Sequence, residues 1–351
     1  MAFDTLSEKR KRILFTLMFG VIAAALILFI VLEIVILSKG GFPFTPDKPS
    51  EIIEATEEPT IEPTEEPTEE PWIYINEDCN TIETRFNPPK GYTRVEVEPG
   101  SFAEYLRTYP LKDYGTLPLQ FSGAINDEAS ALGVLTQPDP LIRNQQCADT
   151  VIMLYAEYLY GQGRFDEISF NFLNGFKCDF KTWAAGYRDK VSGNKVEWVL
   201  STDKPGVVEN DYSYENLYNY LKEVYVYANT DSLALELPSV KPDDLNIGDV
   251  LIGTVKDLKE MARNISDKLA ESINYGHAIL IADMAVNEAG EKVYLFIEGT
   301  TPATECTVVQ NPTISNVCWF YFRTADNTFQ KGTSGIRWRT TWGHSLDKSA
   351  K

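Results

Sequence analysis

The chain has little histidine, little cysteine and no excess of basic residues. Its 351 residues include two histidines, and neither a C-x-x-C nor an H-E-x-x-H pattern occurs, which argues against a protein zinc site. No glycine-rich phosphate loop is present, and we expect neither a metal nor a cofactor. The formal net charge of −19 argues against nucleic acid as a partner, because phosphate binding needs a basic face.

The cysteines form an odd set, so at least one thiol is unpaired. The five are Cys79, Cys147, Cys178, Cys306 and Cys318. Cys306 and Cys318 could pair across a loop outside the membrane, or both could be reduced residues of the core. The sequence therefore assigns no disulfide.

An uncharged apolar run near the N-terminus predicts a membrane anchor. Residues 13–32 carry no charge, and as a helix they would span roughly 30 Å, the thickness of the hydrocarbon core. The basic run Lys9-Arg10-Lys11-Arg12 precedes them, which places residues 1–12 in the cytoplasm and the rest outside. A cleaved signal peptide is the rival interpretation, but its apolar core is normally shorter. We predict a single-pass transmembrane helix over 13–37 and an extracytoplasmic C-terminal domain.

A stalk and one folded domain follow the predicted anchor. Residues 38–72 repeat Glu-Glu-Pro, and residues 47–71 hold ten acidic side chains against Lys48, which favours an extended, semi-rigid spacer. Such stalks are typical of a bacterial envelope. From residue 73 to residue 344 aromatic and aliphatic residues increase, and we predict one extracytoplasmic α+β domain there. Residues 345–351 are expected to be a disordered tail.

Hydrophobic spacing within this domain predicts helices around a β-hairpin. One helix should begin with Asn144 as N-cap, so that Gln145, Gln146 and Cys147 form its first turn, and should end at Gly161 and Gly163. The other expected elements are helices over 101–109, 214–226 and 258–273, strands over 168–172 and 247–253, and a hairpin of strands 277–284 and 292–297.

The chemistry that this pattern indicates is that of a cysteine nucleophile. Cys147 would lie where free N–H groups and the helix dipole favour a thiolate, and Gln146 could add an amide donor for an oxyanion. His277 would be the base. Glu298 on the next strand should lie opposite His277 or two positions diagonal to it, whereas Asp283 is about 20 Å along the same strand. The competing interpretations are a small buried hydrophobe for Cys147 and a hydrogen-bonded strand-end residue for His277.

Several segments of the chain together carry a family resemblance. They include Arg85-Phe86-Asn87-Pro88-Pro89, Gln145-Gln146-Cys147-Ala148-Asp149 and Gly276-His277-Ala278-Ile279-Leu280-Ile281-Ala282-Asp283. These segments resemble a bacterial family known as domain of unknown function 4846. The resemblance runs from about residue 85 to about residue 320.

A more distant resemblance concerns the chemistry. Gly248-Asp249-Val250-Leu251-Ile252 followed by Gly276-His277 is similar to the catalytic strands of papain-like, NlpC-type cell-wall cysteine peptidases. The resemblance implies a helix-start cysteine packed against an antiparallel sheet, with Cys147, His277 and Glu298 as nucleophile, base and orienting group. The chain departs from such enzymes in a helical insertion after Gly253, and from the uncharacterised family in carrying Glu298 where glutamine is usual.

These observations lead to one functional hypothesis and one alternative. The hypothesis is a membrane-anchored extracytoplasmic cysteine hydrolase, an amidase or peptidase that acts on peptidoglycan peptides or an envelope protein. The alternative is a non-catalytic envelope module on a hydrolase-like scaffold that binds a glycan or a protein partner. In either case the insertion at 254–275 is a possible partner surface.

Overall fold

The computed structural model describes residues 72–348, apart from 128, 130, 139–144, 324 and 332–335. Within this part of the chain, no helix combines the length and the apolar character that a bilayer crossing requires. The predicted anchor at 13–37 and the predicted stalk up to residue 71 lie outside the described residues. The description below therefore concerns the predicted α+β domain.

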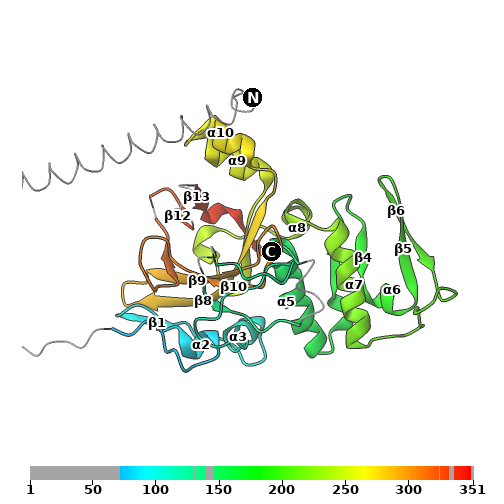
Figure 1. Ribbon diagram of the computed structural model, residues 1–351, viewed down its shortest axis with the longest axis horizontal. Helices are drawn as coiled ribbons and strands as arrows, with labels where there is room; N and C mark the ends of the chain where they lie inside the picture. The colour runs from blue at the N-terminus through cyan, green and yellow to red at the C-terminus, as the bar shows by residue number, and fades with distance from the viewer. Residues whose placement is uncertain are drawn as a thin grey trace, which may run out of the picture. The chain divides into compact units, whose positions relative to one another are not determined.

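An antiparallel sheet forms the centre of the domain (Figure 1). Its main path runs β14-β7-β8-β9-β10-β2, and β1 and β11 pair with β8 and β9 respectively. The strands are β1 (Tyr92–Arg94), β2 (Ala131–Val134), β7 (Asp249–Gly253), β8 (His277–Asn287), β9 (Lys292–Glu298), β10 (Thr307–Val309), β11 (Trp319–Tyr321) and β14 (Gly343–Ser345). With helices packed around it, this sheet confirms the α+β class.

The β8–β9 hairpin was predicted from its apolar runs and its turn residues, and the structure confirms it. Asn287 closes the turn by exchanging backbone and side-chain hydrogen bonds with Glu291. Leu280 pairs with Ile297, so the register continued by one step places Glu298 opposite Ile279 and diagonal to His277. The hairpin thus brings the ends of both strands to the same edge of the sheet.

Helix α5 (Cys147–Gly161) packs on this hairpin with almost all of its first three turns buried. Its end before Gly163, which has φ +69°, is as predicted. Its start is not, because the N-cap is Gln146 rather than Asn144, which lies outside the described residues. The carboxylate of Asp149 accepts a hydrogen bond from the Gln146 N–H at 2.8 Å, which stabilises the helix start at this position and makes Cys147 its first residue.

The remaining elements surround the sheet and α5. Figure 1 shows α6, α7 and β4 to β6 together on the side of α5 away from the sheet. Short helices are α2 (Ile82–Arg85), α3 (Phe102–Arg107), α6 (Phe180–Ala184) and α8 (Thr230–Glu236), and α7 (Tyr214–Tyr227) is longer. Small antiparallel pairs are β3 (Ser169–Asn171) with β4 (Lys177–Asp179), β5 (Tyr187–Ser192) with β6 (Lys195–Leu200), and β12 (Thr328–Gln330) with β13 (Arg337–Arg339). Three 3₁₀ turns span Phe165–Glu167, Pro242–Asp244 and Thr340–Trp342.

The insertion between β7 and β8 is helical, as predicted, but it holds two helices instead of one. These are α9 (Val255–Arg263) and α10 (Asp267–Ser272), which project from the sheet in Figure 1. The prediction of a continuous helix over 258–273 was wrong because two polar residues interrupt it. Asn264 caps the end of α9, and the Ser266 hydroxyl accepts from the N–H of Leu269 at the start of α10.

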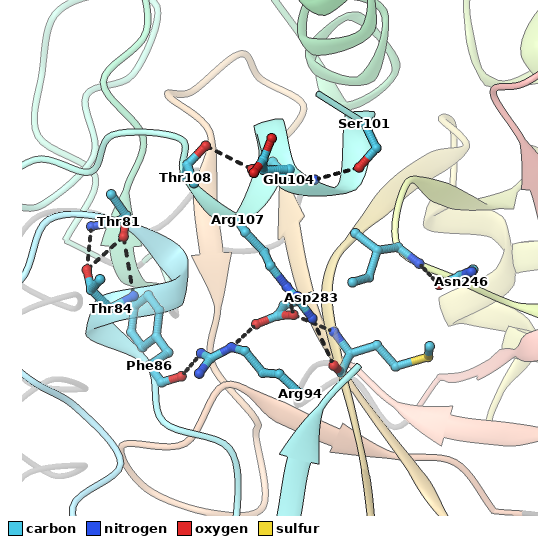
Figure 2. Close-up of polar contacts among 12 residues, drawn as sticks. Thr81, Thr84, Phe86, Arg94, Ser101, Glu104, Arg107, Thr108, Asn246 and Asp283 are labelled. Carbon is cyan, nitrogen blue, oxygen red and sulfur yellow. Dashed lines mark hydrogen bonds and ion pairs between the residues drawn. The ribbon is translucent and has the colours of Figure 1, made fainter. Parts of the chain in front are cut away.

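A buried carboxylate joins the N-terminal elements to the sheet. Asp283 on β8 is fully buried and accepts a hydrogen bond on each oxygen, from Nε of Arg94 and from Nε of Arg107, both at 2.6 Å. Figure 2 shows it between these two side chains. Arg94 belongs to β1 and Arg107 to α3, so three segments are held at one point. The residue excluded above as a partner of His277 therefore has a structural partner set of its own.

Candidate active site

Cys147 occupies the first position of α5 and is almost completely buried, with 4% of its surface exposed. Its sulfur lies 3.9 Å from the carbonyl oxygen of Gly276, directly before β8. The His277 ring and the N–H of Ala278 are also close enough to act on the thiol, and both lower its pKa. The structure therefore brings the two residues together across the 130 positions that separate them.

His277 in turn contacts Glu298. Its Nε2 is hydrogen-bonded to Oε2 of Glu298, which leaves Nδ1 as the ring nitrogen that can serve the thiol. The diagonal register of the β8–β9 hairpin produces this contact, as the sequence predicted. Cys147, His277 and Glu298 thus form one connected set of thiol, imidazole and carboxylate.

Two glycines allow the helix starts to approach the strand ends. A Cβ at Gly276 would lie 2.2 Å from the hydroxyl oxygen of Thr230, the first residue of α8. A Cβ at Gly299 would lie 2.3 Å from the hydroxyl oxygen of Thr150 in the first turn of α5. Because these glycines directly flank His277 and Glu298, any side chain there would force the helices away from the site.

The charges of the set reinforce one another. Burial favours the neutral thiol, but the charge and hydrogen bond of His277 outweigh it and lower the pKa of Cys147. Burial and Lys331 favour the neutral imidazole, yet Glu298 and Cys147 raise the pKa of His277 to about 9. Burial alone would raise the pKa of Glu298, but Lys331 and His277 lower it to about 2. The arrangement therefore favours a thiolate beside an imidazolium.

The other buried cysteines differ from Cys147 in their environment. Burial raises the pKa of Cys178, Cys306 and Cys318 above the usual range. All five cysteines are free thiols, which includes Cys306 and Cys318. Cys147 is therefore the buried thiol that its surroundings activate.

Sequence reasoning missed two residues of the site. The Nζ atom of Lys331 lies 2.6 Å from Oε2 of Glu298, the oxygen that also faces His277. The ring of Trp338 meets the His277 ring edge-on at a centroid distance of 5.7 Å. Lys331 follows β12 and Trp338 is on β13, outside the main sheet. No spacing motif connects this small hairpin to β8, so the sequence contained no signal for it.

Of the two glutamines before Cys147, Gln146 is the better placed to donate a side-chain hydrogen bond to an oxyanion. Its side-chain oxygen accepts a hydrogen bond from the Thr301 hydroxyl at 3.1 Å, and its amide nitrogen has no partner among the described residues. Gln145 is fully buried and donates to the Thr150 hydroxyl at 3.0 Å. Gln146 can therefore present an N–H beside the thiol, whereas the Gln145 amide is already used.

A cleft of about 390 Å³ opens onto this region. It is lined by the first turn of α5, the junction of α7 and α8, and the residues on both sides of the α9–α10 insertion, and Cys147 and Gln146 are among its walls. His277 is not a lining residue, so the thiol is the member of the set that the cleft reaches. In the part of the chain that the structure describes, no group of three or more His, Cys, Asp or Glu is arranged to hold a metal ion.

The comparisons with known proteins give one match. The family model described as domain of unknown function 4846 matches residues 82–334 and so spans Cys147, His277, Glu298 and Lys331. No curated protein and no solved structure matches the chain. Because the family model covers well over half of the sequence, the chain is a member of the domain of unknown function 4846 family.

Proposed function

We propose that the protein is a membrane-anchored, extracytoplasmic cysteine hydrolase that cleaves an amide bond in a cell-envelope peptide. The observation that carries the proposal is the connected set Cys147–His277–Glu298 at the start of a helix, with the thiol opening on a cleft. The order of these residues and their placement on a helix and two adjacent strands also suit a papain-like arrangement.

The first half-reaction would form an acyl-enzyme. The Cys147 thiolate attacks the carbonyl carbon, and the electron pair of the C=O bond moves to oxygen. The backbone N–H groups at the start of α5 and the Gln146 amide would hold this oxyanion. When the C–N bond breaks, the His277 imidazolium gives its proton to the leaving amine, and a thioester remains on the sulfur.

The second half-reaction would release the acid. Neutral His277 takes a proton from water as the water oxygen attacks the thioester carbon. The C–S bond breaks, sulfur leaves as thiolate, and the imidazolium is regenerated. Glu298 would take no part in bond making or breaking, and its role would be to orient the ring and to stabilise its charged form.

The first test is the reactivity of the thiols in the full-length protein. We expect iodoacetamide to alkylate Cys147 faster than the other four cysteines at pH 7, and His277→Ala to slow it about 10- to 100-fold by raising the thiol pKa. His344→Ala is the matched control, because His344, the other histidine of the chain, donates from Nδ1 to the Leu237 carbonyl and is not among the groups that act on the thiol. Peptide mapping by mass spectrometry measures both rates.

Equal slow labelling of all five cysteines would overturn the proposal. If Cys147 is selectively reactive, the second step is to incubate the protein with purified peptidoglycan and count new amino groups. Cys147→Ala should abolish their release.

A non-catalytic envelope binding module is the second candidate. It is favoured by the low exposure of Cys147 and by the absence of His277 from the lining of the cleft. A binding module predicts that Cys147→Ser leaves the cellular phenotype of the protein intact, while changes on the α9–α10 surface remove it. Loss of the phenotype with Cys147→Ser alone would favour the hydrolase.

A further inference from the structure

Among the described residues, the cleft at Cys147 is lined by acidic side chains and by no basic ones. Asp149 of α5 and Asp231 of α8 are among its walls, and none of the described residues that line it is Lys, Arg or His. Both aspartates lie in the first turn of a helix, where an acidic side chain is favoured by the unpaired N–H groups. That position explains why aspartate occurs at both places, but it does not explain why the carboxylate of Asp149 is buried without an ion-pair partner among the described residues.

Asp149 is a buried carboxylate that forms no ion pair with any of the described residues. It is 5% exposed, and one oxygen accepts the hydrogen bond from the Gln146 N–H. The other oxygen has no hydrogen-bond partner among the described residues, and no ion pair reaches it there. Burial accordingly raises the pKa of Asp149 to about 7. A carboxylate held in this way is costly unless a positive or hydrogen-bond-donating group joins it.

Tyr225 is a second unpaired group in the same cleft. Its hydroxyl oxygen is buried and has neither a donor nor an acceptor among the residues that the structure describes. Tyr225 comes from α7, whereas Asp149 comes from α5, so separate elements contribute the two groups. Burial first, and then the negative charge of Asp149, raise the pKa of Tyr225, so its hydroxyl stays neutral. A buried hydroxyl without a partner loses hydrogen bonds that a ligand could restore.

We propose that the substrate carries a protonated amine close to the scissile bond, and that this ammonium binds between the Asp149 carboxylate and the Tyr225 hydroxyl. This inference rests on the proposed function. An ammonium has three N–H donors, so it can satisfy the free carboxylate oxygen and the hydroxyl oxygen at once while neutralising the buried charge. Asp231, half-buried in the same wall, adds negative charge that attracts the cation.

The test compares cationic and neutral thiol reagents of similar size on the full-length protein. Aminoethyl and propyl methanethiosulfonate each transfer their alkylthio group to a thiolate and release methanesulfinate. Each rate at Cys147 is divided by that reagent's rate with N-acetylcysteine. We expect the normalised rate to be about 10-fold higher for the aminoethyl reagent, since 1.4 kcal/mol of favourable interaction corresponds to a factor of ten.

Two variants and a control assign the preference to the proposed groups. Asp149→Asn and Tyr225→Phe should each reduce the ratio of the two normalised rates, and the ratio cancels any effect on the thiol itself. Asp166→Asn removes an equal charge at an exposed site paired with Lys181, and should leave the ratio unchanged. Agreement between Asp149→Asn and Tyr225→Phe makes the result independent of how well either variant folds.

Two small amines then distinguish the source of the ammonium. Protection of Cys147 by alaninamide alone would indicate a peptide amino terminus, and protection by acetyl-lysinamide alone a side-chain amine. Equal normalised rates at a reactive Cys147 would overturn the amine site and leave the hydrolase proposal standing. A Cys147 that reacts no faster than the partly exposed Cys79 with the neutral reagent would count against the hydrolase itself.

Discussion

Two carboxylates on adjacent strands, Asp283 and Glu298, are each held by two basic side chains, with different consequences. Asp283 receives Arg94 and Arg107 on separate oxygens and is completely buried. Glu298 receives His277 and Lys331 on a single oxygen, and 11% of its side chain is exposed. Guanidinium groups keep their charge under all ordinary conditions, whereas an imidazole can gain or lose a proton.

The difference indicates a structural role for the ion cluster around Asp283 and a role in proton transfer for the cluster around Glu298. The permanent charges around Asp283 connect β1 and α3 to β8, and the thiol that lies near them, Cys318, has a raised pKa, mainly because it is buried and also because of the charge of Asp283. The titratable charges around Glu298 extend through His277 to Cys147. Figure 2 shows both arginines directed at the carboxylate of Asp283, with Arg94 also donating to the Phe86 carbonyl. The same strand, β8, contributes to both.

The largest expected effect would test the structural cluster. Asp283→Asn leaves two arginines against a neutral group in the core, and we expect a loss of about 3–5 kcal/mol in the free energy of unfolding. Urea denaturation followed by tryptophan fluorescence measures it. Glu298→Gln is the matched variant at the partly exposed cluster and should cost less. A loss below that of Glu298→Gln would show that the two clusters do not differ as described.

A smaller effect should appear in the pH dependence of stability. The pKa of His277 is raised to about 9 from an ordinary 6.5, so its stabilisation is complete below about pH 6.5 and is lost as the pH rises through 9. The pKa of Glu298 is lowered to about 2 from 4.5, so its stabilisation is present above pH 4.5 and lost as the pH falls through 2. The ion pair therefore stabilises most between these limits.

His277→Asn isolates this contribution. The difference in unfolding free energy between the wild type and His277→Asn should be constant near pH 6 and shrink by about 1–2 kcal/mol between pH 6.5 and 9. The difference for Asp283→Asn should not shrink over that range, because arginine remains charged. A constant difference for His277→Asn would mean that the imidazole is not charged in the folded protein.

The smallest expected effect concerns Lys331. Its ammonium competes with His277 for Oε2 of Glu298 and favours the neutral imidazole. Lys331→Met should therefore raise the pKa of His277 by up to about one unit. In the pH profile of Cys147 alkylation, the basic limb should move to higher pH. Lys331→Arg keeps the charge and should leave the profile near that of the wild type. An unchanged profile in Lys331→Met would remove Lys331 from the site.

The sequence predicted the elements that depend on local pattern. The β8–β9 hairpin and α5 were found because apolar periodicity, turn residues and terminal glycines are all local signals. The contact between His277 and Glu298 followed because a hairpin turn fixes the register of its strands, and the register fixes which side chains share a face.

The features that the sequence missed depend on tertiary contacts or on competing caps. Lys331 and Trp338 reach the site from a small hairpin whose docking has no sequence pattern. Tyr225 is distinguished by a buried hydroxyl without a partner among the described residues, and that depends on how α7 packs. The starting point of α5 was misplaced because Asp149 satisfies the backbone at Gln146, an interaction that favours the later N-cap over Asn144.

The way in which the α9–α10 insertion is attached to the sheet has a consequence for how far its length can vary. Gly253 and His277, the residues on either side of it, are cross-strand partners in the β7–β8 ladder. The chain therefore leaves the sheet and returns to it at the same pair of residues. The pairing of β7 with β8 does not depend on how many residues lie between them. Longer or shorter excursions cost little closure entropy. Replacement of this insertion by another of different length would therefore leave the position of the imidazole unchanged.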